Sequence, residues 1–415
     1  MLEFLQTKTI KDTAVVTAGM ALSTLLSAAS IFLLARWLGP ASFGLYATAL
    51  AVAVIVTDAL ELAISNAIVK FSSRQGPEAA AFIHYGFKLK LRLGFLVGAG
   101  FALLSYLVAD WIHPQLKLPL LVSALFVPVV FWSRFPRSLL RAQKRFLADS
   151  VLENITSSAR LAGIGLFYWL GKLTIIAGLA AYLGGNLAAL AVGVFLIDWK
   201  FLKAKIEAKV KRQFFGFQKW LTLGFIVAAV HSRIDTVLLL KLVGPEATGI
   251  YQAAYRFFMP VIQLASVLSL VFAPRFASFP DLATSRVYLF KAVRLSLLIG
   301  AAVLVMIPLA AWLVQLIFGA EYLGAILPVQ ILAIGFFGFI AGAPWVSFLL
   351  YFAAKAKTFF YLNLVQLGLI VGLNLWLTPR FQAVGAALAA SLTLLLTNLL
   401  IAAVTWRLLY AKQKN

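Results

Sequence analysis

Residues 36–46 read RWLGPASFGLY, and residues 241–251 read KLVGPEATGIY. The two stretches lie 205 positions apart and match at the basic residue, the Gly-Pro pair, the second glycine and the tyrosine. The same offset relates residues 70–73 (KFSS) to residues 275–278 (RFAS). In a chain of 415 residues this repeat indicates two halves of one architecture. Duplicated halves of this kind are typical of membrane transporters.

The repeated Gly-Pro-x-x-x-Gly pattern predicts a tight hairpin between two helices in each half. Proline cannot continue the preceding helix, and glycine accepts backbone angles that a side chain forbids. We expect Tyr46 and Tyr251, which follow the hairpins, to lie at the bilayer interface, where aromatic side chains are enriched. The residues to which we assign a structural role in the hairpins are Gly39, Pro40, Gly44, Gly244, Pro245 and Gly249.

The composition places the chain in a lipid bilayer. Hydrophobic residues make up 63% of it and charged residues only 12%, which is more apolar surface than a soluble domain can bury. Because a membrane-spanning helix needs roughly 20 apolar residues, we predict an all-α polytopic protein with about twelve transmembrane helices. The predicted spans are 13–34, 45–67, 88–109, 118–136, 149–171, 174–197, 220–242, 250–272, 291–316, 325–350, 358–377 and 384–408.

The net charge of +22 indicates membrane topology and not nucleic-acid binding. Only Arg160, Arg233 and Arg256 are expected inside the spans, and nearly all other Lys and Arg residues flank the even-numbered loops and the termini. This distribution predicts a multi-pass protein of the cytoplasmic membrane with both termini in the cytoplasm. A nucleic-acid surface needs a soluble domain to carry it, and none is predicted.

The longest hydrophilic stretch divides the chain into halves of six predicted spans each. The expected organisation is an N-terminal lobe at 1–198, a basic cytoplasmic linker at 199–219 and a C-terminal lobe at 220–415. An even number of spans per lobe gives both lobes the same orientation, so we predict a parallel repeat. We interpret the linker as a solvated, lipid-facing segment on anionic headgroups.

Polar residues inside the predicted spans share helix faces. A charge in the middle of a bilayer costs at least ~2.5–3.5 kcal/mol on insertion scales, so it needs a partner or a wet cavity. Asp58 and Glu61, three residues apart, are expected on one side of the span 45–67. In the span 149–171 a polar stripe starts at the cytoplasmic end and consists of Asp149, Glu153, Ser157 and Arg160.

The internal repeat separates scaffold from candidate working residues. Asp58 shifted by 205 positions leads to Gln263, and Arg256 shifted back leads to Ala51. The hairpins are therefore duplicated, whereas the charges are not. This difference favours the charged residues as the functional ones.

Three motifs carry a resemblance to a known family: the two Gly-Pro-x-x-x-Gly-x-Tyr hairpins, the pair Ile234–Asp235 and the stretch 316–322, LIFGAEY. They resemble the polysaccharide-biosynthesis (Wzx-like) flippases of the multidrug/oligosaccharidyl-lipid/polysaccharide (MOP) superfamily, which also holds the MATE exporters. The resemblance runs over nearly the whole chain. It implies two six-helix lobes around a central cavity and alternating access to the two sides of the membrane.

The same resemblance suggests roles for the charged residues. Guanidinium groups match phosphate oxygens, so we expect the substrate to be bound by Arg233, Arg256 and Arg160. A coupling cation, or charge neutralisation of the arginines, is expected at Asp58, Glu61 and Asp235. The structural alternative is a set of buried pairs that lock helix packing, and Asp235 is the acid we most expect to orient its helix. Capture of a headgroup at the inner surface is a hypothesis, beside a role in topology alone, for Arg137, Arg141 and Lys144.

The implied function is a flippase that moves a polyprenyl-diphosphate-linked oligosaccharide from the cytoplasmic to the outer leaflet. Its partners would be this substrate and membrane lipids, with a glycan polymerase as a candidate, and the coupling ion stays open. The first alternative is a MATE-like cation-coupled exporter of small molecules. The second is a membrane glycosyltransferase or polymerase, which the short outer loops disfavour. Cysteine is absent, and we find no catalytic motif or metal cluster, so we predict no catalytic residue, no metal and no cofactor.

Overall fold

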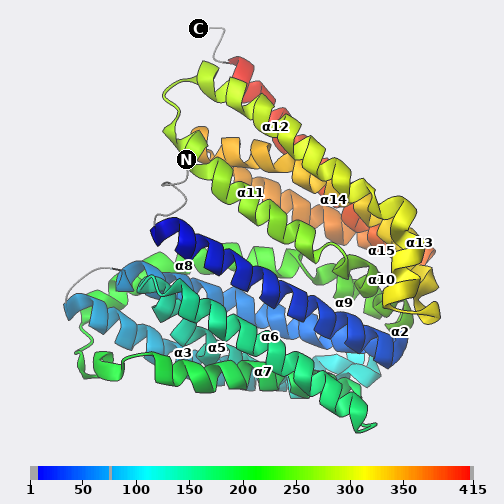
Figure 1. Ribbon diagram of the computed structural model, residues 1–415, viewed down its shortest axis with the longest axis horizontal. Helices are drawn as coiled ribbons and strands as arrows, with labels where there is room; N and C mark the ends of the chain where they lie inside the picture. The colour runs from blue at the N-terminus through cyan, green and yellow to red at the C-terminus, as the bar shows by residue number, and fades with distance from the viewer. Residues whose placement is uncertain (1–7, 74–76, 412–415) are drawn as a thin grey trace. The chain divides into compact units, whose positions relative to one another are not determined.

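The computed structural model describes residues 8–73 and 77–411, and these residues form helices and short connections without a strand (Figure 1). Nine helical segments among them are long and apolar enough to cross a membrane. Their outer faces expose large apolar side chains, such as Leu96, Leu103 and Trp111 along α3 (Pro77–Ile112). A face of this kind is stable against lipid and not against water. The chain is therefore an all-helical, multi-pass membrane protein.

The helices divide into two compact units. Unit 1 consists of Met1–Leu38 and Leu45–Arg233, and unit 2 of Gly39–Gly44 and Ile234–Asn415. Besides most of α2 (Lys8–Ser72) and α3, unit 1 contains η1 (Pro114–Leu116), α4 (Lys117–Ala124), α5 (Phe126–Ala142), α6 (Phe146–Trp169), α7 (Ile175–Leu196), η2 (Trp199–Lys203) and α8 (Ala208–His231). Unit 2 contains α9 (Ile234–Leu242), α10 (Pro245–Arg256), α11 (Met259–Ser278), α12 (Leu282–Leu304), α13 (Met306–Ile317), η3 (Ala320–Ala325), α14 (Ile326–Ser347), η4 (Phe348–Phe352) and α15 (Ala356–Ala411).

Small residues set the close helix contacts of unit 1. The helix α6 packs along α7, and α5 packs against both α7 and α3. A Cβ atom on Gly185 of α7 would lie 2.5 Å from the carbonyl oxygen of Thr156, and one on Gly193 would lie 2.9 Å from Pro136 Cβ. Glycine at these two positions lets the backbones approach, as is common between membrane helices.

In unit 2 the central helix is α14, which packs against α15, α12 and α11 (Figure 1). Its glycines Gly335, Gly338 and Gly342 lie on one face, at spacings of three and four. A Cβ atom on any of them would collide with a residue of α15. Aromatic rings fill other contacts of α14, for example that of Phe336 with Phe258, whose stacked rings have centroids 4.8 Å apart.

Two of the longest helices contain a break in backbone geometry. In α2 the break is at Gly39 (φ 73°), and in α15 it is at Gln382 (φ 52°). Each of these helices holds two of the predicted spans, one on either side of its break. The helix α6 covers the predicted span 149–171 except its last two residues and carries three charged residues, Asp149, Glu153 and Arg160.

Both glycines that precede the hairpin prolines have a positive φ, in agreement with the prediction that glycine there accepts angles a side chain forbids. Gly39 has φ 73° and Gly244 has φ 124°, values that side chains disfavour. Tyr46 and Tyr251, which were expected at the bilayer interface, both have side chains buried within the protein. Tyr251 is held there by its hydroxyl, which donates a hydrogen bond to Asp235.

The two copies of the hairpin motif contact each other within unit 2. A Cβ atom on Gly44 would lie 2.0 Å from the carbonyl oxygen of Pro245, and one on Gly249 would lie 1.9 Å from that of Pro40. Real Cβ atoms do not approach an oxygen so closely, so no side chain fits at either position. The second glycine of each motif is therefore required by the proline of the other.

Candidate functional site

Four charged side chains form a network in unit 1, two of them buried and two half-buried. Lys90 Nζ lies 2.6 Å from Glu61 Oε1, and Arg134 Nη1 lies 2.9 Å from Glu61 Oε2 and 2.7 Å from Asp58 Oδ1. The Ser65 hydroxyl donates to Glu61 Oε1 at 2.5 Å. Glu61 and Lys90 are 0% and 1% exposed. Asp58 and Glu61 thus share one side of α2, and each has a basic partner.

A second group of ion pairs lies between α5 and α6. Arg137 Nε contacts Asp149 Oδ1 at 2.8 Å, and Arg141 Nε contacts Asp149 Oδ2 at 2.6 Å. Arg137 also pairs with Glu153. Of the three residues expected to capture a headgroup, the structure brings Arg137 and Arg141 together. Lys144 is exposed, with a positive φ of 58°, in the connection that follows α5.

The two groups border one cavity of about 420 Å³. The charges around it balance, since the carboxylates of Asp58, Glu61, Asp149 and Glu153 face an equal number of basic side chains. Guanidinium groups can exchange a carboxylate for a phosphate oxygen because both ligands fit the same fork of donors. The residues that line the cavity are Glu61, Leu62, Ser65, Asn66, Val69, Arg134, Arg137, Ser138, Arg141 and Glu153.

Arg160 lies further along α6 and has different neighbours. Its Nη2 atom donates to Ser27 Oγ at 2.7 Å, and its guanidinium carbon lies 5.4 Å from the centre of the Tyr182 ring. Ser157 Oγ lies 2.9 Å from Ser27 Oγ and 3.2 Å from Ser23 Oγ. In the polar stripe predicted for α6, Asp149 and Glu153 therefore contact arginines. Ser157 and Arg160, in its second half, contact serine hydroxyls.

In unit 2 the predicted residue Asp235 lies at the start of α9. Asp235 Oδ1 accepts the backbone N–H of Thr236 at 2.7 Å, and Gln252 Nε2 donates to Thr236 Oγ1 at 2.5 Å. With the hydrogen bond from Tyr251, these contacts connect α9 to α10. Arg256 is buried in the last turn of α10.

Arg233, the last residue of unit 1, lies in the short break between α8 and α9. Its side chain is half-buried and has no ion-pair partner in the described part of the chain. In the same residues no cluster of His, Asp and Glu has the composition of a metal site.

Sequence reasoning missed Lys90 and misplaced Arg134. Both were counted among the basic residues that flank cytoplasmic loops, yet each contacts Glu61 inside the protein. A signal was present for Lys90, because it lies within the predicted span 88–109, where a lysine requires a partner. Its partner could not be inferred, since Glu61 lies 29 positions away on another helix.

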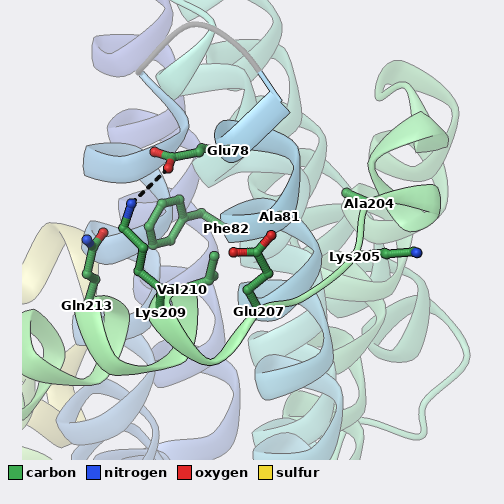
Figure 2. Close-up of a pocket in the computed structure, with 9 residues that line it drawn as sticks. All are labelled: Glu78, Ala81, Phe82, Ala204, Lys205, Glu207, Lys209, Val210 and Gln213. Atoms are coloured by element: carbon green, nitrogen blue, oxygen red, sulfur yellow. Dashed lines mark hydrogen bonds and ion pairs between the residues drawn. The ribbon is translucent and has the colours of Figure 1, made fainter.

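A smaller cavity of about 280 Å³ lies where the chain enters α8 (Figure 2). Lys209 Nζ pairs with Glu78 Oε1 across it at 3.2 Å, and both side chains are exposed. The His84 ring donates to the carbonyl oxygen of Ala204 at 2.7 Å, and Phe201 and Phe214 are buried nearby. Segment 199–219 therefore belongs to unit 1 and packs within it through aromatic residues, while its lysines face outward. The weak, exposed polar lining makes this cavity a poorer candidate site.

Comparison with known proteins gives consistent results. A Shigella flexneri protein named "Putative O-antigen transporter" is 22% identical over 397 residues, which cover 92% of this chain and 94% of the relative. The fold is similar to that of the lipid II flippase MurJ, with a TM-score of 0.77 at 17% identity over 94% of this chain and 87% of that one. It is also similar to an inward-facing multidrug transporter of the MATE family and MOP superfamily, with a TM-score of 0.78 at 12% identity over 95% of this chain and 96% of that one.

The family itself is shown by sequence. The family described as "Polysaccharide biosynthesis protein" matches residues 9–279, which are more than half of the chain. The membership predicted from the hairpins is confirmed. The chain belongs to the polysaccharide biosynthesis protein family.

Proposed function

We propose that the protein is a flippase that moves a polyprenyl-diphosphate-linked oligosaccharide from the cytoplasmic to the outer leaflet of the cytoplasmic membrane. Family membership supports this function, as does the relative named as an O-antigen transporter, which aligns over almost its full length. The fold shared with a lipid II flippase agrees with it. The protein acts by alternating access and carries out no catalysis.

The observation that carries the proposal is the cavity lined by Arg134, Arg137 and Arg141 in unit 1. Their charge is neutralised by carboxylates at hydrogen-bond distance. A diphosphate replaces some of these carboxylates on the guanidinium groups, so substrate binding exchanges one set of anions for another. This exchange favours neutralisation over cation coupling as the role of Asp58 and Glu61.

The arrangement around this cavity completes the proposal. The twelve predicted spans form two lobes, 1–198 and 220–415, joined by the linker 199–219, with both termini in the cytoplasm. Arg137, Arg141 and Lys144 receive the headgroup at the inner surface, and Arg233, Arg256 and Arg160 bind it during transfer. Asp235, which contacts Thr236 and Tyr251, orients α9 and neutralises a neighbouring arginine. A glycan polymerase consumes the product.

The membrane potential favours this direction of transport. An inside-negative potential drives an anion outward with ~2.3 kcal/mol per charge per 100 mV. A diphosphate is therefore exported by the potential alone, and no bound cation is required for the net driving force.

A second function, MATE-like export of small molecules, rests on the TM-score of 0.78 to a multidrug transporter. A cation exporter needs acidic groups that are available to its substrate. Here Glu61 and Asp149 are each paired with two basic side chains. A drug-resistance assay on overexpression separates the two functions, and we expect no resistance.

The direct test is flipping of a defined lipid-linked oligosaccharide in liposomes. We expect Arg137→Gln and Arg141→Gln together to lower the flipping rate at least ~10-fold, with folded protein retained in the membrane. The matched control is Arg212→Gln, an exposed arginine of α8 outside the cavity. In cells, Arg233→Ala or Arg256→Ala should abolish surface glycan. Flipping at the wild-type rate by the double variant would contradict the role of the cavity.

A further inference from the structure

Arg160 combines deep burial with the absence of a counter-charge. Its side chain is 9% exposed, yet no carboxylate among the described residues lies within ion-pair distance of it. Its Nε atom is buried and has no hydrogen-bond partner in the part of the chain that the structure describes. Arg134 and Arg137, in contrast, each contact two carboxylates. A buried guanidinium without a counter-charge is typical of a site that binds an external anion.

Three serine hydroxyls near Arg160 suit an anion because each of them can donate a hydrogen bond. Ser27 on α2 and Ser157 on α6 carry hydroxyls 2.9 Å apart, and Ser23 lies one helical turn from Ser27. A serine hydroxyl rotates freely and can turn its proton toward an oxyanion. Ser27 is already in contact with Arg160, at 2.7 Å. Arginine and hydroxyl donors together match the oxygens of a phosphoryl group.

The backbone around the site is fixed by close contacts. Gly185 of α7 lies over Arg160, where a Cβ atom would be 3.3 Å from Arg160 Cβ and 2.5 Å from the Thr156 carbonyl oxygen. On the other side, Asn154 Nδ2 donates to the carbonyl oxygen of Gly19 at 3.1 Å, which connects α6 to α2. These contacts hold the serine and arginine side chains in register before any ligand arrives.

We propose that Arg160, Ser23, Ser27 and Ser157 form a phosphoryl subsite between α2 and α6, separate from the cavity of paired arginines. The proposal rests on the flippase function and names the part of the substrate bound there: one phosphoryl oxyanion of the lipid-linked diphosphate. Binding at this subsite supplies the missing negative charge. The cavity arginines exchange anions, whereas this subsite gains one.

Binding of two probes to the purified full-length protein in detergent tests the subsite. The probes are inorganic pyrophosphate and farnesyl diphosphate, and the readout is the dissociation constant by calorimetry. We expect Arg160→Gln to weaken binding of farnesyl diphosphate at least ~10-fold, and Ser27→Ala with Ser157→Ala, which keeps the charge, to weaken it ~3- to 10-fold. Tighter binding of farnesyl diphosphate than of pyrophosphate assigns the site to a lipid-linked ligand, and equal binding assigns it to free phosphates as well.

Two neighbouring glycines provide a matched pair of positioning variants. Gly185→Ala pushes α7 away from Arg160 and should weaken binding, whereas nothing lies within 4 Å of a Cβ atom on Gly184. Gly184→Ala should therefore bind like the wild type. Binding of both probes that is unchanged in Arg160→Gln and in the double serine variant would overturn the subsite.

The flipping assay keeps this inference distinct from the function on which it rests. If Arg160→Gln flips lipid-linked oligosaccharide like the wild type while the cavity variants do not, the subsite is wrong and the flippase function stands. If the wild type flips no such lipid but loses diphosphate binding on Arg160→Gln, the function is wrong and the anion site stands.

Discussion

The charged residues in the first and second halves of α6 have different neighbours. In the first half, Asp149 and Glu153 face Arg137 and Arg141, and every ionised group has an opposite charge beside it. In the second half, Arg160 faces serine hydroxyls and an aromatic ring. Charges in ion pairs neutralise each other within the protein, whereas the charge of Arg160 has no counter-charge among the described residues. The difference indicates which charges hold the fold and which await a ligand.

The comparison predicts the largest loss of stability where a balanced pair is broken. Glu61→Gln leaves Lys90, which is 1% exposed, without a carboxylate. Breaking a buried pair in this way costs about 3–5 kcal/mol in the free energy of unfolding. The measurement is thermal unfolding of the purified protein in detergent.

A double variant separates lost charge balance from lost packing. Glu61→Gln combined with Lys90→Gln removes both charges, so it should be more stable than Glu61→Gln alone. If the single variant melts at the wild-type temperature, the network does not stabilise the protein and the comparison fails.

A much smaller effect on stability is expected at the other half of the helix. Arg160→Gln loses a hydrogen bond to Ser27 but also removes a buried charge without a counter-charge. The two changes oppose each other, so the free energy of unfolding should move by no more than about 1 kcal/mol in either direction. The same unfolding assay measures it. A loss as large as that of Glu61→Gln would mark Arg160 as a structural cation.

The smallest effect on stability is expected at Asp281, whose carboxylate accepts a backbone hydrogen bond at one end of a helix. Asp281, outside the spans, accepts the backbone N–H of Thr284 at 2.7 Å at the start of α12, and this bond lowers the pKa of the Asp281 carboxyl. Because the pKa is lower in the folded than in the unfolded state, the ionised carboxyl stabilises the protein at any pH above the ordinary pKa of an aspartate. This contribution is lost as the pH falls through the lowered folded-state pKa. Asp281→Asn should therefore melt slightly below the wild type at pH 7, and this difference should disappear in acid, below the ordinary pKa range of an aspartate. A difference that persists in acid would place the effect elsewhere.

Local pattern was sufficient to predict much of this molecule. The apolar composition gave the membrane class, and the Gly-Pro pairs gave the breaks at Gly39 and Gly244 with their positive φ angles. The spacing of Asp58 and Glu61 placed them on one face, where Arg134 contacts both. Each of these features depends on residues that are close together in the chain.

Pairing between distant helices could not be predicted. The face of α6 was visible from the spacing of its polar residues, but nothing in that spacing distinguishes a neighbour with arginines from a neighbour with serines. Lys90 was assigned to a cytoplasmic flank by its charge alone, although its side chain reaches Glu61 inside the protein. Tyr251 was expected at the interface because aromatic side chains are enriched there. Its buried acceptor Asp235, 16 positions earlier on another helix, could not be predicted.

The reciprocal contact of the hairpins changes the meaning of the internal repeat. Gly44 has no room for a side chain because of Pro245, and Gly249 has none because of Pro40. A change in one copy is therefore felt by the other, and neither copy can diverge alone. Each copy of the motif sterically restricts the glycine of the other. This mutual restriction explains why so short a motif is still recognisable in halves that otherwise share little sequence.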